Sequence, residues 1–352
     1  MYQLLNCSND SRCSLGPLFE SSFVNNYYIA MLSISSITVI MTSVSSFIFT
    51  FIIKPDTPFL KLLHLYSLNS LFVLLNDFIM ALIYLISNPL VYLYNGRERY
   101  TDNYGLEFWG TLVYINLRQI FFFFGSILEI YIVYERLGIY DSKWKFFKNI
   151  SNKMLWSIIF TMAFFINLPF NIGRDASTKE FFLTDTNSTK SVYFSGSRQF
   201  EYSEILDGVV FVCSIIRDIV TLALEILLTI ILIYKVHVFW HKKNLSQKNN
   251  AQRNILFKAR ARSNLKICFT LCLLSTMYHS LSFSTFMAKE FDKTPGQSYY
   301  ILIGITGSFA VHFKYAMSFI IFYMFNNKFR SALFSCLLSR RFDATSPVNN
   351  SN

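Results

Sequence analysis

The residues best suited to chemistry are a few charged side chains inside otherwise apolar stretches. Glu135 and Arg136 form an adjacent acid–base pair at the end of a long apolar run, and Glu129 and Arg118 precede Arg136 by seven and eighteen residues. At about 100° per residue, Arg118, Glu129 and Arg136 fall within about 20° of one azimuth of a helix. A charge inside a membrane is costly unless it is paired or reaches water, so this face is predicted to point away from lipid. The helix that carries it is predicted to be the central one.

Two further sites place acidic residues inside apolar runs. Asp77 is explained either by a helix-packing hydrogen bond or by an ion- or water-binding switch, because intramembrane acids are usually functional. Arg217 and Asp218 are adjacent in a later run. Neighbouring residues on a helix point about 100° apart, so this pair is expected to meet other helices rather than each other. A salt bridge from this pair to the helix of Arg118 and a contact with a ligand both remain open.

The composition indicates which elements position these charges. Of the 352 residues, 53% are hydrophobic and only 15% are charged, with a mean hydropathy of +0.37, whereas soluble domains carry about 25% charged residues. The apolar residues form seven runs, and each is near or above the ~20 residues that span hydrocarbon. We therefore predict an all-α membrane protein, a seven-transmembrane helix bundle occupying residues 27–325. The runs cover roughly 27–53, 61–87, 110–135, 154–172, 206–234, 265–288 and 298–325.

The distribution of positive charge predicts the orientation of the bundle. Of the 32 Lys and Arg residues, 20 lie in or at the edge of the segments between alternate runs and the C-terminal segment, against 9 in the other segments. Lys and Arg collect on the cytosolic side of membrane proteins, so residues 1–26 are expected outside and the C-terminus in the cytosol. The net charge of +11 is thus explained without nucleic acid. We expect a multi-pass protein of the plasma membrane.

The predicted outer segments carry acceptor sites for glycans. Asn6, Asn9 and Asn187 each begin an Asn-x-Ser/Thr sequence, so we predict glycosylation there. Cys7 and Cys13 share the N-terminal segment and could form a disulfide with each other. No cleavable signal peptide is expected, because the first apolar run is too long for one.

The segment after the last run has the pattern of a surface helix. In residues 326–338, Phe329, Leu333, Cys336 and Leu337 recur every three to four residues, with cationic residues on another face. This predicts a short amphipathic helix on the inner membrane surface, in contact with lipid. Cys336 is either a palmitoylation site or simply a buried thiol. Residues 339–352 are expected to form a disordered cytoplasmic tail.

No set of residues points to catalysis. The sequence has no Gly-rich phosphate loop, no HExxH and no paired-Cys metal spacing, and its five histidines are scattered. We therefore expect no enzyme activity, no metal site and no cofactor.

Taken together, the motifs resemble those of the rhodopsin-like G-protein-coupled receptors, across residues 27–338. Tyr134-Glu135-Arg136-Leu137 resembles the Asp/Glu-Arg-Tyr motif of helix three, Asp77 matches the sodium-site aspartate of helix two, and Trp156 matches the tryptophan of helix four. The segment Ser318–Arg330 aligns with Asn-Pro-x-x-Tyr and the short helix that follows it. The pattern departs from the family at Ser318-Phe319, where Asn-Pro is usual, and at Thr111, where the helix-three cysteine would fall. These losses are similar to those of nematode-type serpentine chemoreceptors.

The resemblance implies roles for several residues. The motif arginine, Arg136, would hold the inactive state with Glu135 and then contact a heterotrimeric G protein, and Lys258, Arg260 and Arg262 are expected on the same cytosolic surface. Arg118 would face the pocket for a small-molecule or peptide ligand, where its planar fork suits a carboxylate. Asp218 would line the same pocket, so Arg118 could instead be neutralised by Asp218.

A seven-helix ion channel or transporter is the alternative function. Its path would be lined by the intramembrane charges, which are Arg118, Glu129, Asp218, Glu225 and Lys314. Against it, the seven runs show no internal repeat of the kind that transporters contain.

Overall fold

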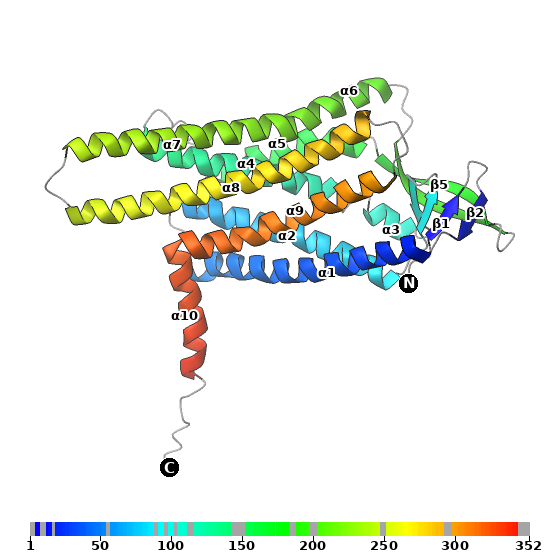
Figure 1. The fold of residues 1–352 in the computed structure, drawn as a ribbon, viewed down its shortest axis with the longest axis horizontal. Helices are drawn as coiled ribbons and strands as arrows, with labels where there is room; N and C mark the ends of the chain where they lie inside the picture. Colours follow the sequence, from blue (N-terminus) through cyan, green and yellow to red (C-terminus); the bar gives the residue numbers. More distant parts are fainter. Residues whose placement is uncertain are drawn as a thin grey trace, which may run out of the picture.

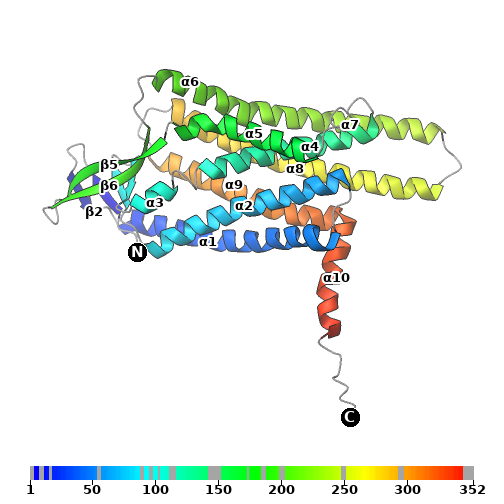
Figure 2. The ribbon, with the colours of Figure 1, turned by 180° about the vertical axis from the view of Figure 1, so that it is seen from behind.

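The structure is a computed structural model, and helices make up most of it (Figure 1). It describes residues 4–7, 12–15, 18–53, 57–87, 91–94, 98–101, 104–110, 116–141, 152–172, 174–183, 188–197, 203–246, 251–291 and 297–343. The long helices run side by side along one axis, and the strands gather at one end of them (Figures 1 and 2).

Each of the seven predicted apolar runs coincides over most of its length with a helix. Within the described residues, five helices are long and apolar enough to cross a membrane, as expected for a helical membrane protein, at Tyr28–Ile53, Pro58–Ile86, Asn116–Tyr140, Gly208–Phe239 and Arg262–Ser284. Two more apolar helical stretches, Trp156–Phe170 and Phe309–Phe325, are shorter. The full helices are α1 (Leu18–Phe47, continued by a π-helical segment Ile48–Ile53), α2 (Pro58–Ser87), α4 (Asn116–Tyr140), α5 (Asn152–Ile172), α6 (Ser203–Ser214, followed by a π-helical segment Ile215–Val220), α7 (Thr221–Ser246), α8 (Ala251–Phe291) and α9 (Gln297–Phe325).

Local sequence explains where helix α2 begins. Thr57 accepts a hydrogen bond from the Leu60 backbone N–H on its side-chain oxygen at 3.4 Å, and Pro58 occupies the first helical position. Threonine is a favoured N-cap and proline a favoured first residue, because the proline lacks an N–H that would go unpaired there.

Helix α4 is the centre of the bundle, as its charged face predicts. It packs against α2, α5, α7 and α8. Of its apolar window 56% is buried, against 28–44% in the other four long apolar helices. Its residues Leu128, Ile132 and Leu137 are completely buried in the main hydrophobic core.

The six strands are an addition that the sequence analysis did not expect. They are β1 (Leu4–Cys7), β2 (Arg12–Leu15), β3 (Val91–Tyr94), β4 (Glu98–Thr101), β5 (Arg174–Leu183) and β6 (Ser188–Ser197), and they close into a small barrel in the order β1-β2-β5-β6-β4-β3. The strands come from the three segments before α1, after α2 and after α5, all of which the charge count assigns to the outer side. The backbones of Cys7 and Cys13 are cross-strand partners in the β1–β2 hairpin.

The opposite end of the bundle is shaped by α7, α8 and a final helix, α10 (Asn327–Asp343). Helices α7 and α8 project beyond their neighbours, and α10 turns away across the bundle axis (Figure 1). The Asn326 side chain accepts a hydrogen bond from the Phe329 backbone N–H at 3.2 Å, which caps α10. Phe329 is fully buried against Phe49 and Phe322, while Lys328 and Arg330 are exposed.

Helix α10 is longer than predicted. The helical stretch was expected to end at residue 338, with a disordered tail from 339, but α10 continues to Asp343. Ser339 to Asp343 are polar apart from one phenylalanine, so the apolar pattern used to set the boundary gave no signal there. A membrane-surface position for α10 stays a prediction.

Candidate functional site

Charged side chains inside the bundle collect in three clusters, and α4 contributes to each. The Asp77 cluster consists of Ser35, Asp77, Arg118 and His312. The Asp218 cluster consists of Ser126, Arg217, Asp218, His279 and Ser282. The Glu129 cluster consists of Glu129, Ser275 and Lys314. Each cluster joins three or four different helical elements, so its contacts depend on how those elements are packed against each other.

The Asp77 cluster neutralises the acid of α2. Arg118 Nη2 donates to Asp77 Oδ2 at 3.1 Å, and Arg118 Nε lies 2.7 Å from Oδ1 in an ion-pair contact. His312 Nε2 of α9 lies 3.5 Å from Asp77 Oδ2 and 2.8 Å from the Ser35 hydroxyl of α1. The Asp77 side chain is fully buried and that of Arg118 is 19% exposed. An ion at Asp77 would therefore have to replace Arg118, and the predicted ion or water site stays a prediction.

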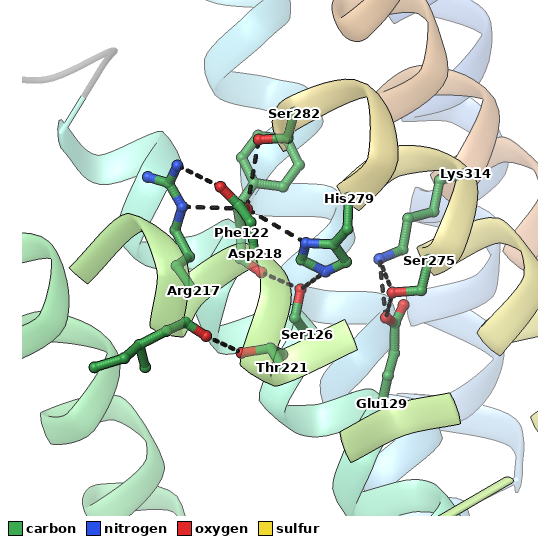
Figure 3. Close-up of polar contacts among 11 residues, drawn as sticks. Phe122, Ser126, Glu129, Arg217, Asp218, Thr221, Ser275, His279, Ser282 and Lys314 are labelled. Atoms are coloured by element: carbon green, nitrogen blue, oxygen red, sulfur yellow. Dashed lines mark hydrogen bonds and ion pairs between the residues drawn. The ribbon is translucent and has the colours of Figure 1, made fainter. Parts of the chain in front are cut away.

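The Asp218 cluster is built on the π-helical segment before α7 (Figure 3). Arg217 Nη2 donates to Asp218 Oδ2 at 2.8 Å, and Ser282 of α8 donates to Oδ1 at 3.4 Å. His279 Nδ1 lies 3.4 Å from the same Oδ1, and its Nε2 lies 3.1 Å from the Ser126 hydroxyl of α4. Asp218 thus links the π-helical segment to α8 directly and to α4 through His279.

The expectation that Arg217 and Asp218 would avoid each other was wrong. The argument assumed the 100° spacing of a regular α-helix, but both residues lie in the π-helical segment Ile215–Val220, where that spacing does not hold. The long arginine side chain also curls back over its neighbour, with its guanidinium 5.0 Å from the Phe170 ring centroid.

The predicted rival pairing of Arg118 with Asp218 is also replaced. The structure pairs Arg118 with Asp77, which α2 presents to α4, and gives Asp218 its own cation in Arg217. Sequence alignment could place Arg118 and Asp218 near one pocket but could not rank the acids within reach. A ligand contact of either residue stays a prediction.

The Glu129 cluster lies about one helical turn after Ser126 on α4, on the side away from the strands (Figure 3). Lys314 Nζ of α9 donates to Glu129 Oε2 at 2.9 Å, and the Ser275 hydroxyl of α8 donates to the same oxygen at 2.8 Å. Both charged side chains are buried, Glu129 at 0% and Lys314 at 3% exposed. A buried pair of this kind is costly to break, because either partner alone would be an uncompensated charge.

The end of α4 opposite the strands carries the predicted switch residues. Arg136 is partly buried, and its guanidinium carbon lies 3.1 Å from the ring centroid of Phe59 on α2. Glu135 is partly buried beside it. One turn on, Asp141 accepts a hydrogen bond from Lys235 of α7 at 2.8 Å, which ties α4 to α7 at this end. The Ser263 hydroxyl of α8 donates to the Phe325 backbone carbonyl, which ties α8 to the end of α9.

Several predicted residues lie where the structure says less. Lys258 and Arg260 belong to the first half of α8, with side chains outside the described part, and Arg262 is exposed. Asn6 lies in β1, while Asn9 and Asn187 lie outside the described residues. Cys336 is a partly buried cysteine on α10. Palmitoylation and glycosylation stay predictions.

The roles of two histidines and one ion pair were not predicted from the sequence. His279 and His312 were seen only as scattered histidines, and the Asp141–Lys235 contact was not considered. A signal was available for the histidines, because each interrupts an apolar helix with a group that needs a hydrogen-bond partner there. Among the described residues no group of three or more His, Cys, Asp or Glu side chains could hold a metal ion.

Comparison with models of known protein families and with curated proteins gives no match for this chain.

Proposed function

We propose that this chain is a seven-transmembrane G-protein-coupled receptor of a chemosensory kind, which transmits binding of a small extracellular ligand to a cytosolic heterotrimeric G protein. The observation that carries the proposal is the series of cross-helix clusters along α4, which is followed by Glu135 and Arg136 and then by the contact of Asp141 with Lys235 of α7. Such an arrangement couples a change at one end of the bundle to the helix positions at the other.

The clusters favour a receptor over an open ion path. Among the described residues, four of the five charges that would line a path have a charged partner: Arg118 contacts Asp77, Glu129 contacts Lys314, and Asp218 contacts Arg217. The Arg118–Asp77 and Glu129–Lys314 pairs join different helices, and a charge that is already paired is not available to a passing ion. The alternative of a transporter keeps one supporting observation, the buried and unpartnered Glu225, which could serve a proton-linked cycle.

Signalling in the proposed receptor is a population shift between two helix arrangements. A polar ligand that competes for Arg217 or Asp218 would loosen the contact of Asp218 with α8, through His279 and Ser282. Losing these contacts raises the free energy of the arrangement in which the inner ends of α7 and α8 lie together, called the closed state. The arrangement in which these ends are separated therefore becomes more populated. The Lys235–Asp141 contact opposes that separation, and Arg136 would leave Phe59 to meet the G protein.

The test is nucleotide exchange on purified heterotrimeric G proteins, with the chain in lipid nanodiscs and a library of small polar and volatile compounds. We expect at least one compound to stimulate exchange through the wild type and none through Arg136→Ala at equal protein amount. Arg330→Ala, an exposed arginine on α10, is the matched control and should respond like the wild type. Ion or solute flux in liposomes without any effect on G proteins would contradict the proposal and favour the transporter.

A further inference from the structure

The interior of the bundle holds one more carboxylate than it holds cations. Within the described part of the membrane helices, Asp77, Glu129 and Asp218 each contact an arginine or lysine, as given above. Glu225 on α7 is the fourth acid. It is 0% exposed, and neither of its carboxylate oxygens has a hydrogen-bond partner.

The surroundings of Glu225 offer it no spare cation. The titratable groups that act on it or are acted on by it electrostatically are Glu129 of α4, Lys314 of α9, Tyr66 of α2, and the thiols of Cys268 and Cys272 of α8. Lys314 is the basic member of this set, and its ammonium is bound to Glu129 at 2.9 Å. If both acids were ionised, the group would carry two negative charges against one positive charge in a medium without water.

The hydroxyl of Ser275, which lies beside Glu225, already donates its hydrogen to another acid. Ser275 lies beside Glu225, but its single O–H donates to Glu129 Oε2 at 2.8 Å. An ionised Glu225 could only accept hydrogen bonds and would gain nothing from Ser275. A protonated Glu225 could instead donate its own O–H to a lone pair of the Ser275 oxygen. A proton on Glu225 therefore supplies the donor for this contact without breaking the bond from Ser275 to Glu129.

We propose that Glu225 is a proton-binding site, loaded when α7 is packed against α4 and α8 and emptied to water when α7 moves away. In the packed arrangement the proton forms an O–H bond with a Glu225 oxygen and removes the surplus negative charge. Burying an ionised carboxylate without a partner is so costly that the group neutralises instead. When water reaches Glu225, the O–H bond breaks, the proton passes to water, and the carboxylate is solvated.

This site would make the helix arrangement sensitive to pH. One proton separates the two arrangements, so linkage changes their ratio by up to about tenfold per pH unit, with alkaline pH favouring separation. The link to signalling rests on the proposed receptor function. The proton site itself does not, because it can be measured without ligand or G protein.

The test is infrared spectroscopy of the full chain in lipid nanodiscs at neutral pH, where solvated carboxyl groups are ionised. A protonated buried carboxylic acid gives a C=O stretching band that is separate from the amide and carboxylate bands. We expect this band in the wild type, its loss in Glu225→Gln, and its retention in Glu135→Gln, which makes the same change at the end of α4. If Glu225→Gln does not fold, Glu225→Asp decides the question, because a retained acid should shift the band instead of removing it.

Two results would overturn the proposal. One is a spectrum in which no acid band depends on residue 225, which would mean that Glu225 is ionised in the packed bundle. The other is an acid band that disappears in NaCl but persists in choline chloride of equal ionic strength, which would identify the occupant as a sodium ion. Absence of G-protein activation with the band present would reject the receptor function and leave the proton site standing.

Discussion

The Asp77–Arg118 pair gives the sharpest test of how the bundle is held together. Removing one partner of a buried ion pair costs roughly 3–5 kcal/mol, because the other charge is left uncompensated. Arg118 is 19% exposed and can reach some solvent when Asp77 is lost. Asp77 is fully buried, and among the described residues His312 is the basic side chain that it keeps when Arg118 is lost. We therefore expect Asp77→Asn to cost about 3 kcal/mol and Arg118→Gln about 4 kcal/mol. The double variant has no charge left to bury, so it should cost about 3 kcal/mol less than additivity predicts.

The assay is equilibrium unfolding of the purified protein in mixed micelles, with the four members of the double-mutant cycle measured side by side. A second cycle with Arg118→Gln and Asp218→Asn is the matched control. Its energies should add to within about 0.5 kcal/mol, because the two residues belong to different clusters. Strong coupling in the Asp218 cycle with additive energies in the Asp77 cycle would refute the pairing and restore the alternative that the sequence suggested.

Three more predictions concern the ends of the bundle. Lys235→Ala should raise ligand-independent nucleotide exchange about 1.4- to 5-fold, because a contact with Asp141 as exposed as this one stabilises the closed end by roughly 0.2–1 kcal/mol; an unchanged or lowered basal rate would show that the contact does not restrain α7. Asn187 should carry a glycan that peptide-N-glycosidase removes, and an epitope at the N-terminus should be labelled on intact cells; labelling only after permeabilisation would reverse the orientation. Cys336 should incorporate a palmitate analogue that hydroxylamine releases and that Cys336→Ser lacks, whereas equal labelling of the variant would place the lipid elsewhere.

The sequence was sufficient for features that depend on one helix at a time. Length and hydropathy located the apolar helices, and the azimuth of Arg118, Glu129 and Arg136 identified α4 as the central one. The spacing of apolar residues around Phe329 likewise predicted the buried face of α10. Each of these follows from the period of an α-helix, which the residue order records directly.

Features that depend on two elements were predicted poorly. Arg118 had several acids within reach, and only the packing of α2 on α4 selects Asp77. The contact between Arg217 and Asp218 lies in a π-helical segment, and no sequence motif predicts that segment. Strands β1 to β4 are only four residues long, which is too short for a β pattern to be recognised, and β1 and β2 also need the distant β3 and β5 as partners. Strands β5 and β6 have ten residues each and pair with each other as a hairpin, so a local signal existed there and was not used.

The barrel at the strand end of the bundle has a consequence for the order in which the chain is assembled. Strand β1 pairs in parallel with β3, and β2 pairs in parallel with β5. The first strands to be synthesised must therefore wait until α1, α2, α4 and α5 have been made before their last partner appears. Pairing between such distant segments is slow, because the entropy of loop closure is lost before any stabilising contact forms. During that interval the β1–β2 hairpin has unpaired edges that invite wrong partners.

Insertion of α1, α2, α4 and α5 should therefore precede closure of the barrel, because β5 and β6 follow these helices in the chain. A chain arrested after α5 but before β6 would hold its helices in place while its N-terminal hairpin remained open to proteases. Closure of the barrel therefore depends on the insertion of the helices between its strands, because it requires segments from three places in the chain to lie on the same side of the membrane.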